Sequence, residues 1–187
     1  METPQTHSET APARKLPMWA VVLAFALLLG FLALIAVGLR RTMSGPIVVG
    51  DPVPEINMTT FDGQAISSAD LAGKVIVLNF WASWCKPCEQ EARELEEAFQ
   101  FYKENDKVVF LGLAYVDTEP KSRGYLEQFG ITYPNGPDLR TQVSQMFRIR
   151  GVPETYIIGS DGTLKFVKIG PFTSTQEIIS AVDSFIE

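Results

Sequence analysis

The sequence has 187 residues, of which 16 are Lys or Arg and 22 are Asp or Glu, so its net charge is −6. This acidic balance argues against a nucleic-acid partner, because nucleic-acid-binding proteins need basic surfaces that neutralise phosphates. The single histidine is His7, near the N-terminus. The rest of the chain therefore has no Cys-His dyad and no histidine-based metal site.

The first part of the chain predicts a membrane anchor. Residues 1–15 form a short polar tail, and residues 16–39 carry no charge, which gives about 24 residues to span a hydrocarbon core. A cleaved signal peptide is the alternative, but its apolar region has only about 7–15 residues. An uncleaved anchor is therefore favoured, followed by a linker at 40–50 and a single folded domain at 51–187.

The sequence of the domain predicts alternating strands and helices. Two nearly unbroken apolar runs, residues 74–81 and 107–116, are typical of strands buried on both faces. Between them, apolar residues recur at steps of four and three, which predicts an amphipathic helix: Cys88, Ala92, Leu95, Phe99 and Tyr102. Ahead of these runs, an Asp-Gly turn at 61–64 joins two short extended pieces.

Further elements follow toward the C-terminus. A helix is expected over 119–129 with its end at Gly130, then a short helical piece over 139–147. Residues 154–170 predict two strands joined by an Asp-Gly turn. The last helix should carry apolar residues on one side: Ile178, Ile179, Val182, Phe185 and Ile186. This order of elements predicts an α/β fold.

The only two cysteines, Cys85 and Cys88, lie in WASWCKPC, where the first buried strand gives way to the helix. As a staple they would stabilise the fold weakly, because a disulfide stabilises less when its loop is short. As a metal clip they would lack further ligands within one chain, so no metal is expected. As a redox couple, Cys85 would lie at a helix N-terminus that stabilises a thiolate, and the more buried Cys88 could resolve a mixed disulfide. The redox interpretation is favoured.

The segment NFWASWCKPC, followed about 60 residues later by GVPETYIIGSDG, resembles the thioredoxin superfamily. With the apolar stretch and the opening segment VGDPVPEINMTTFDGQ, the chain more narrowly resembles the membrane-anchored reductases of cytochrome c maturation, the DsbE/ResA type. The resemblance covers about residues 46–187. It implies a thioredoxin-like α/β fold, with a central mixed sheet flanked by helices, preceded by one N-terminal transmembrane helix.

The resemblance also implies roles for residues of the motif. Cys85 would be the attacking thiol and Cys88 the resolving one, with a disulfide between them in the oxidised state. Trp84 would flank the site and contact substrate. Lys86 and Pro87, between the cysteines, would tune the reduction potential.

A second segment contributes to the implied site. Pro153 matches the family's cis-proline, which faces the dithiol and leaves a backbone edge at Val152 free to pair with an extended substrate. Glu154, beside it, either lines the substrate groove or faces solvent. Both interpretations remain open for Glu154.

The chain departs from cytosolic thioredoxins at Asn79, six residues before Cys85, where those proteins carry a buried Asp. Asn cannot titrate, so we expect Asn79 to be a buried side chain hydrogen-bonded to its neighbours. Proton transfer to and from the resolving thiol then needs another group. Glu91 lies three residues after Cys88 and is the candidate; alternatively, Glu89 and Glu91 only complement the helix N-terminus.

The leading functional hypothesis is an extracytoplasmic enzyme that reduces disulfides by thiol–disulfide exchange, without a cofactor. Its expected partners are disulfide-bearing proteins, with apocytochrome c or a carrier that feeds it as the implied substrate, and a membrane electron donor that reduces the couple again. Basic residues flank the anchor equally, Arg14 and Lys15 before it and Arg40 and Arg41 after it. Orientation is therefore inferred from the compartment, with the N-terminus cytoplasmic and the domain outside the cell membrane.

The sequence leaves three alternatives to this hypothesis. The first is a general envelope disulfide reductase or oxidant without a cytochrome role, since sequence does not fix a reduction potential. A peroxiredoxin-like peroxidase is less favoured, because Leu78 and Ala82 stand where it would need Pro and Thr. A copper chaperone is also less favoured, because such sites usually add a histidine and the domain has none.

Overall fold

The computed structural model describes residues 17–42 and 47–186, and the chain divides into two compact units, residues 1–45 and 46–187. The predicted polar tail and the middle of the predicted linker lie outside the described residues.

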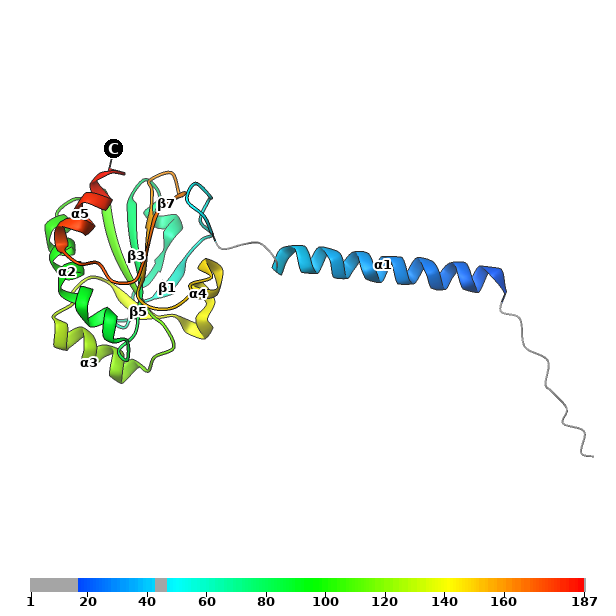
Figure 1. The fold of residues 1–187 in the computed structure, drawn as a ribbon, viewed down its shortest axis with the longest axis horizontal. Coiled ribbons are helices and arrows are strands. Elements are labelled where there is room, and N and C mark those ends of the chain that lie inside the picture. The colour runs from blue at the N-terminus through cyan, green and yellow to red at the C-terminus, as the bar shows by residue number, and fades with distance from the viewer. Residues whose placement is uncertain (1–16, 43–46, 187) are drawn as a thin grey trace, which may run out of the picture. The chain divides into compact units, whose positions relative to one another are not determined.

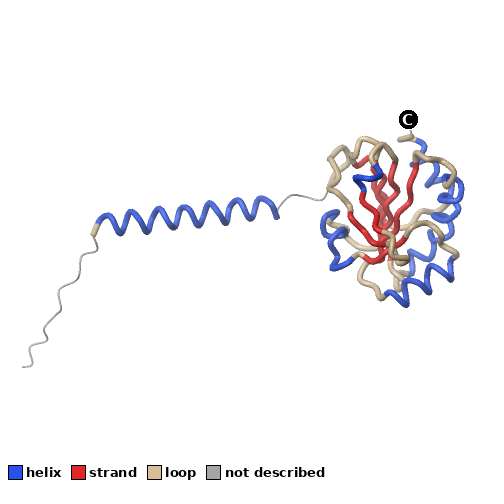
Figure 2. Tube along the Cα trace, turned by 180° about the vertical axis from the view of Figure 1, so that it is seen from behind, coloured by secondary structure: helices blue, strands red, loops and turns tan. Residues whose placement is uncertain are grey.

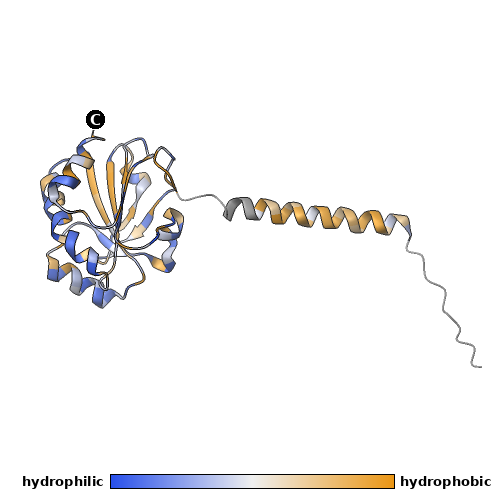
Figure 3. Ribbon diagram, in the orientation of Figure 1, coloured by the Kyte–Doolittle hydropathy of each residue, from blue (hydrophilic) through white to orange (hydrophobic). Residues whose placement is uncertain are grey.

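The described part of the first unit is one helix, α1 (Met18–Thr42). Residues Met18–Gly38 have a mean hydropathy of 3.0, and at 1.5 Å per residue they extend about 31 Å, enough to cross a hydrocarbon core. Apolar residues run along this helix in Figure 3. The helix has the length and composition of a membrane anchor, which a signal sequence would share. It continues through Arg40 and Arg41, so its end lies three residues beyond the predicted span.

The second unit is built on a mixed sheet of five strands in the order β5-β4-β3-β6-β7. The strands are β3 (Val75–Trp81), β4 (Val108–Ala114), β5 (Asn135–Pro137), β6 (Glu154–Ile158) and β7 (Leu164–Ile169). β3, β4 and β5 are parallel, whereas β6 runs antiparallel to β3 and β7 antiparallel to β6. The predicted central mixed sheet is confirmed, and Figure 2 shows it between layers of helix.

Helices cover both faces of this sheet (Figure 1). They are α2 (Lys86–Tyr102), α3 (Glu119–Phe129), α4 (Gln142–Phe147) and α5 (Thr175–Asp183). On one face, Leu95 of α2 and Ile178 of α5 pack in one core with Val77 of β3. On the other, Phe147 of α4 packs in a second core with Leu78 of β3. β3 is therefore buried on both sides, as its continuous apolar sequence predicts.

A short hairpin precedes the sheet. β1 (Asn57–Thr59) pairs antiparallel with β2 (Ala65–Ser67), and the predicted Asp-Gly turn at residues 61–64 joins them. A 3₁₀ turn, η1 (Ser68–Leu71), follows and leads into β3. Met58 of β1 contributes to the core beneath α4, so the hairpin closes that side of the domain.

Several elements differ from the sequence-based expectations. β5 was not expected, because its three residues are Asn, Gly and Pro, which sequence patterns associate with turns. The predicted helical piece over 139–147 is a 3₁₀ turn, η2 (Leu139–Thr141), followed by α4, with positive φ angles at Arg140 and Thr141 separating the two. α5 ends at Asp183, so two of the five apolar residues expected on it, Phe185 and Ile186, lie beyond the helix.

Candidate active site

The two cysteines lie where β3 ends and α2 begins. Cys85 is the N-cap of α2, with φ −88° and ψ 103°, and Pro87 occupies the first turn, where its missing N–H removes no hydrogen bond. The backbone N–H of Cys88 donates to Cys85 Sγ at 3.1 Å. The positive end of the helix dipole and this N–H both favour negative charge on Cys85 Sγ.

Cys85 and Cys88 form a disulfide, with their Cα atoms 5.3 Å apart. Cys88 is 1% exposed and Cys85 only 3% exposed, so both sulfurs are largely enclosed. They pack in a small core with Trp81, Ala92 and Tyr125, whose ring stacks on that of Trp81 at 4.6 Å between centroids. Sequence reasoning missed Tyr125, because its contact with the site depends on how α3 packs.

The loop before β6 reaches the disulfide from the other side. The Val152–Pro153 peptide bond is cis, as the resemblance implies, and the carbonyl oxygen of Val152 lies 3.5 Å from Cys85 Sγ. Pro153 is buried, whereas Val152 is partly exposed. The structure thus brings a backbone edge next to the sulfur expected to react.

Trp84 is exposed beside Cys85, with 58% of its surface accessible. Its indole N–H donates to the carbonyl oxygen of Val116 at 3.0 Å. Val116 has φ 45°, which is unusual for a β-branched residue. β4 ends at Ala114, before the predicted end of the strand at 116. The backbone after β4 therefore supports the motif that follows β3.

The neighbouring Asp117 is a contact that sequence reasoning missed. Its carboxylate accepts hydrogen bonds from the backbone N–H of Ser83 at 2.6 Å and from Ser83 Oγ at 2.9 Å. The sequence does contain a signal for this contact. β3 and β4 are parallel, so the residues that follow β4 lie at the same edge of the sheet as those that follow β3. Asp117 fixes the segment immediately before Trp84 and Cys85.

Lys86 and Pro87 are both exposed on the first turn of α2. The Lys86 ammonium forms an ion pair with Glu89 at 2.7 Å, and the Lys86 side chain is 82% exposed. Both residues between the cysteines therefore lie on the surface.

Glu91 is buried, only 1% exposed, although it belongs to the second turn of α2. Its carboxylate accepts hydrogen bonds from Asn79 Nδ2 and from the backbone N–H of Phe172, each at 2.9 Å. Burial raises the pKa of Glu91 to about 7, while the bonds from Phe172 and Asn79 and the charge of Lys168 oppose that rise. Glu91 is thus not a solvent-facing charge at the helix end, in contrast to Glu89.

Asn79 is buried and hydrogen-bonded, as expected. Besides its bond to Glu91, its Nδ2 donates to Thr155 Oγ1 at 3.0 Å, and Asn79 and Thr155 are partners in the register of β3 and β6. The amide therefore links the helix acid to the sheet.

Glu154 is also buried, at 2% exposed, so the interpretation that it faces solvent is wrong. Its Oε1 accepts from the N–H groups of Arg150, at 2.7 Å, and Gly151, at 3.2 Å, and its Oε2 accepts from the hydroxyl of Tyr156 at 2.6 Å. These bonds hold the loop that carries Val152 and Pro153.

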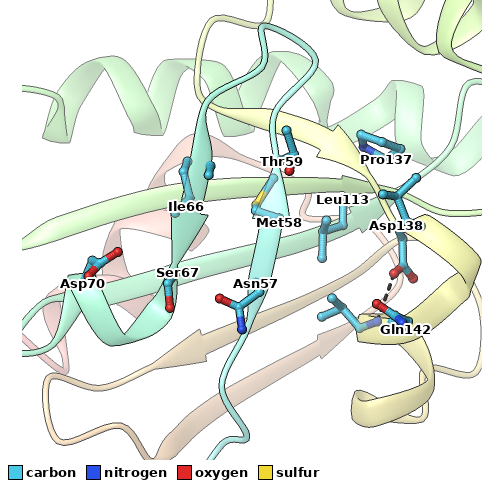
Figure 4. A pocket seen from close by; sticks show the side chains of 13 residues that line it. Asn57, Met58, Thr59, Ile66, Ser67, Asp70, Leu113, Pro137, Asp138 and Gln142 are labelled. Carbon is cyan, nitrogen blue, oxygen red and sulfur yellow. Dashed lines mark hydrogen bonds between the residues drawn. The ribbon is translucent and has the colours of Figure 1, made fainter.

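A separate pocket of about 270 Å³ lies between the β1–β2 hairpin and the segment that leads into α4 (Figure 4). Its buried acid, Asp138, accepts hydrogen bonds from the backbone N–H groups of Val143 and Ser144, at 2.9 and 3.0 Å. Asp138 therefore caps α4. None of the candidate site residues lines this pocket, so it is not part of the redox site.

Comparison with known proteins decides the family. Residues 49–167 match the AhpC/TSA family, over a span that includes both cysteines and the cis-proline loop. The chain belongs to the AhpC/TSA family. This AhpC/TSA member is 32% identical over 158 residues to the thiol-disulfide oxidoreductase ResA of Geobacillus kaustophilus, an alignment that covers 82% of this chain and 89% of the relative. It is 31% identical over 128 residues to ResA of Bacillus cereus, covering 68% and 73%.

Solved structures agree with this placement. A thioredoxin-family thiol:disulfide interchange protein from Chlorobium tepidum has 27% identity and a TM-score of 0.66, over 76% of this chain and 97% of that one. The dsbF protein of Mycobacterium tuberculosis has 25% identity and a TM-score of 0.65, over 72% and 99%. The protein is a thioredoxin-like thiol-disulfide oxidoreductase of the ResA/DsbE type, with Cys85 and Cys88 as its Cys-x-x-Cys pair. The predicted thioredoxin-like fold and the predicted class of enzyme, a thiol-disulfide oxidoreductase, are confirmed.

Proposed function

We propose that this enzyme reduces disulfides outside the cell membrane and serves cytochrome c maturation, with apocytochrome c or a carrier that feeds it as substrate. The observation that carries the proposal is the placement of Cys85 Sγ at the N-terminus of α2 and 3.5 Å from the Val152 carbonyl oxygen. The ResA relatives, named as thiol-disulfide oxidoreductases, support the chemistry. The cytochrome role rests on the resemblance to the DsbE/ResA type.

The reaction begins from the reduced pair. The Cys85 thiolate attacks one sulfur of the substrate disulfide, forms a mixed disulfide and releases the first substrate thiolate, which takes up a proton. The Cys88 thiol loses its proton, and its sulfur attacks Cys85 Sγ and releases the second substrate thiolate. Two electrons pass to the substrate, and the enzyme is left with the Cys85–Cys88 disulfide. A membrane electron donor must then reduce it again.

In this proposal Glu91 accepts the proton that the Cys88 thiol loses. It lies one turn along α2 from Cys88, on the same helical face, and its pKa near 7 lets it change protonation state at physiological pH. Asn79 holds the acceptor oxygen in place through its 2.9 Å hydrogen bond. This pair would replace the buried Asp of cytosolic thioredoxins.

The substrate would bind along the cis-proline loop. An extended segment can pair with the backbone at Val152, while Trp84 offers an exposed aromatic face beside the sulfur. Glu154 acts indirectly in this proposal, because it fixes the loop through backbone hydrogen bonds. Lys86 and Pro87, exposed between the cysteines, would set the potential.

The decisive experiment is trapping in the native cell. The full-length Cys88→Ser protein cannot resolve the mixed disulfide, so its substrates should remain linked to Cys85 and be identified by mass spectrometry. Apocytochromes c or their maturation partners among the captured proteins would support the proposal. A broad set of unrelated envelope proteins would instead indicate a general reductase, and no capture at all would refute the assigned role of Cys85. The Cys85→Ser/Cys88→Ser protein is the control.

A further inference from the structure

The segment that leads to the cis-proline has a charge opposite to that of the domain. Residues 42–187 contain 12 Lys or Arg and 20 Asp or Glu, a net charge of −8. Residues 139–153, by contrast, contain three Arg and no Asp or Glu. Two of these arginines, Arg148 and Arg150, stand four and two residues before Val152 and are both exposed. We call them the arginine pair.

A hydrogen bond fixes the backbone of Arg150 two residues before Val152, whose carbonyl faces the reactive sulfur. The Glu154 carboxylate holds the backbone N–H of Arg150 at 2.7 Å, and the Val152 carbonyl lies 3.5 Å from Cys85 Sγ. With about 3.8 Å between successive Cα atoms, Arg150 lies within about 8 Å of Val152 along the backbone. Arg150 forms no ion pair with any residue that the structure describes.

Arg148 also lies at the edge of a pocket. It caps the C-terminus of α4 and lines an open pocket of about 270 Å³ together with Tyr115, Ser144 and Ile149. Tyr115 directly precedes Val116, whose carbonyl holds Trp84. The pocket is therefore bounded by α4, by Ile149 just after it and by Tyr115 just after β4.

We propose that the arginine pair binds carboxylates of an acidic segment that flanks the reactive disulfide of the substrate protein. Guanidinium groups bind carboxylates through two parallel hydrogen bonds, and complementary charge speeds the encounter of two proteins. A negatively charged enzyme repels acidic partners in general, so a local positive site selects those that approach in the orientation for exchange. The inference rests on the proposed disulfide-reductase function and deepens it by giving the substrate's charge.

The test uses the reduced full-length protein in an uncharged detergent. Two peptides carry the same Cys-x-x-Cys disulfide, one flanked by glutamates and the other by glutamines, and the second-order rate constant for reduction of each is measured. The wild type should prefer the glutamate peptide by about three- to fivefold at low salt, as expected for exposed charge pairs of about 0.5 kcal/mol each. The preference should fall toward one as salt shortens the screening length.

The Arg148→Gln/Arg150→Gln protein should lose that preference. The matched control, Arg93→Gln/Lys103→Gln, removes two exposed cations elsewhere on α2 and its C-cap and should keep it. Equal rates for the two peptides in the wild type, or loss of the preference in the control as well, would overturn this inference alone. Reduction of neither peptide would overturn the proposed reductase function, and the inference with it.

Discussion

At the scale of single residues, Glu91 distinguishes this site because it is a buried acid with a raised pKa. Burial of its carboxyl favours the neutral acid, whereas the hydrogen bonds from Asn79 and from the N–H of Phe172 favour the carboxylate. Desolvation dominates, and the pKa is raised to about 7. A group with these properties affects stability, and its proposed role in catalysis can be tested separately.

The first prediction concerns the pH dependence of unfolding. Because the pKa of Glu91 is about 7 in the fold, against about 4.5 when unfolded, its contribution to the unfolding free energy falls as pH rises from 4.5 to 7. The expected loss is about 3 kcal/mol, at 1.36 kcal/mol per pKa unit. The Glu91→Gln protein should show a correspondingly flatter pH profile in chemical denaturation of the oxidised chain. An unchanged profile would show that Glu91 does not titrate in this range.

The same substitution tests the proposed role in catalysis. In the reduced Glu91→Gln protein, the Cys88 thiol should titrate at a different pH from the wild type, because its nearby proton acceptor is gone. Thiolate absorbance of a Cys85→Ser background isolates the Cys88 titration. Glu127→Gln, on an exposed position of α3, is the control that should leave it unchanged.

The second prediction concerns Asp117. Asp117→Ala removes both hydrogen bonds to Ser83. Hydrogen bonds to a charged acceptor contribute about 1.5–3 kcal/mol each when buried. Because this site is only half-buried, we expect the unfolding free energy to fall by about 1–2 kcal/mol. The KM for a peptide disulfide should rise more than kcat changes, because Trp84 loses its support. Asp117→Asn, which keeps one acceptor oxygen, should lose less. Asp106→Ala, an exposed acid in the turn before β4, should have no effect on KM.

At the scale of elements, patterns with a local cause could be predicted and those set by packing could not. β3 and α2 are visible in the sequence because a two-faced strand is continuously apolar and an amphipathic helix is periodic. β5 is not visible, because an Asn-Gly-Pro segment becomes a strand only by pairing with β4. The split between η2 and α4 likewise depends on Asp138, whose carboxylate binds backbone N–H groups several residues later.

The third prediction tests the β4–β5 contact. A Cβ at Gly112 would lie 1.8 Å from Asn135 Oδ1, which also accepts a 2.7 Å hydrogen bond from the Trp81 indole. Gly112→Ala should therefore lower the unfolding free energy by about 1–3 kcal/mol, as overpacking does. In the exposed Gly124→Ala of α3, where nothing lies within 4 Å, stability should instead rise by about 0.5–1 kcal/mol. Similar effects of the two substitutions would contradict the β5 placement.

At the scale of the whole molecule, the residues that react could be predicted from the sequence better than the residues that hold them in place. Cys85, Cys88 and the cis-proline follow from a short motif and a resemblance. The burial of Glu154 and the contacts of Asp117 and Tyr125 arise from segments distant in the chain, and one sequence carries no measure of that packing. The apolar helix was equally plain from composition, but its orientation was not.

The fourth prediction concerns that orientation. In a chain whose two cysteines are replaced by serine, Asp106→Cys should react with a membrane-impermeant maleimide in intact cells, because the domain is proposed to lie outside. Ser8→Cys, in the N-terminal tail, should react only after the membrane is permeabilised. The reverse pattern would place the domain in the cytoplasm and contradict the proposed location.

The central claim, that the Cys85–Cys88 couple works as a reductase, is tested most directly by its reduction potential. The full-length protein is equilibrated with glutathione buffers of graded potential, and the fraction oxidised is read from thiol labelling. A reductase should have a potential well below about −200 mV, near the −270 mV of thioredoxin. A value near the −120 mV of DsbA would mean that the couple oxidises its partners, and would contradict the proposed direction of electron flow.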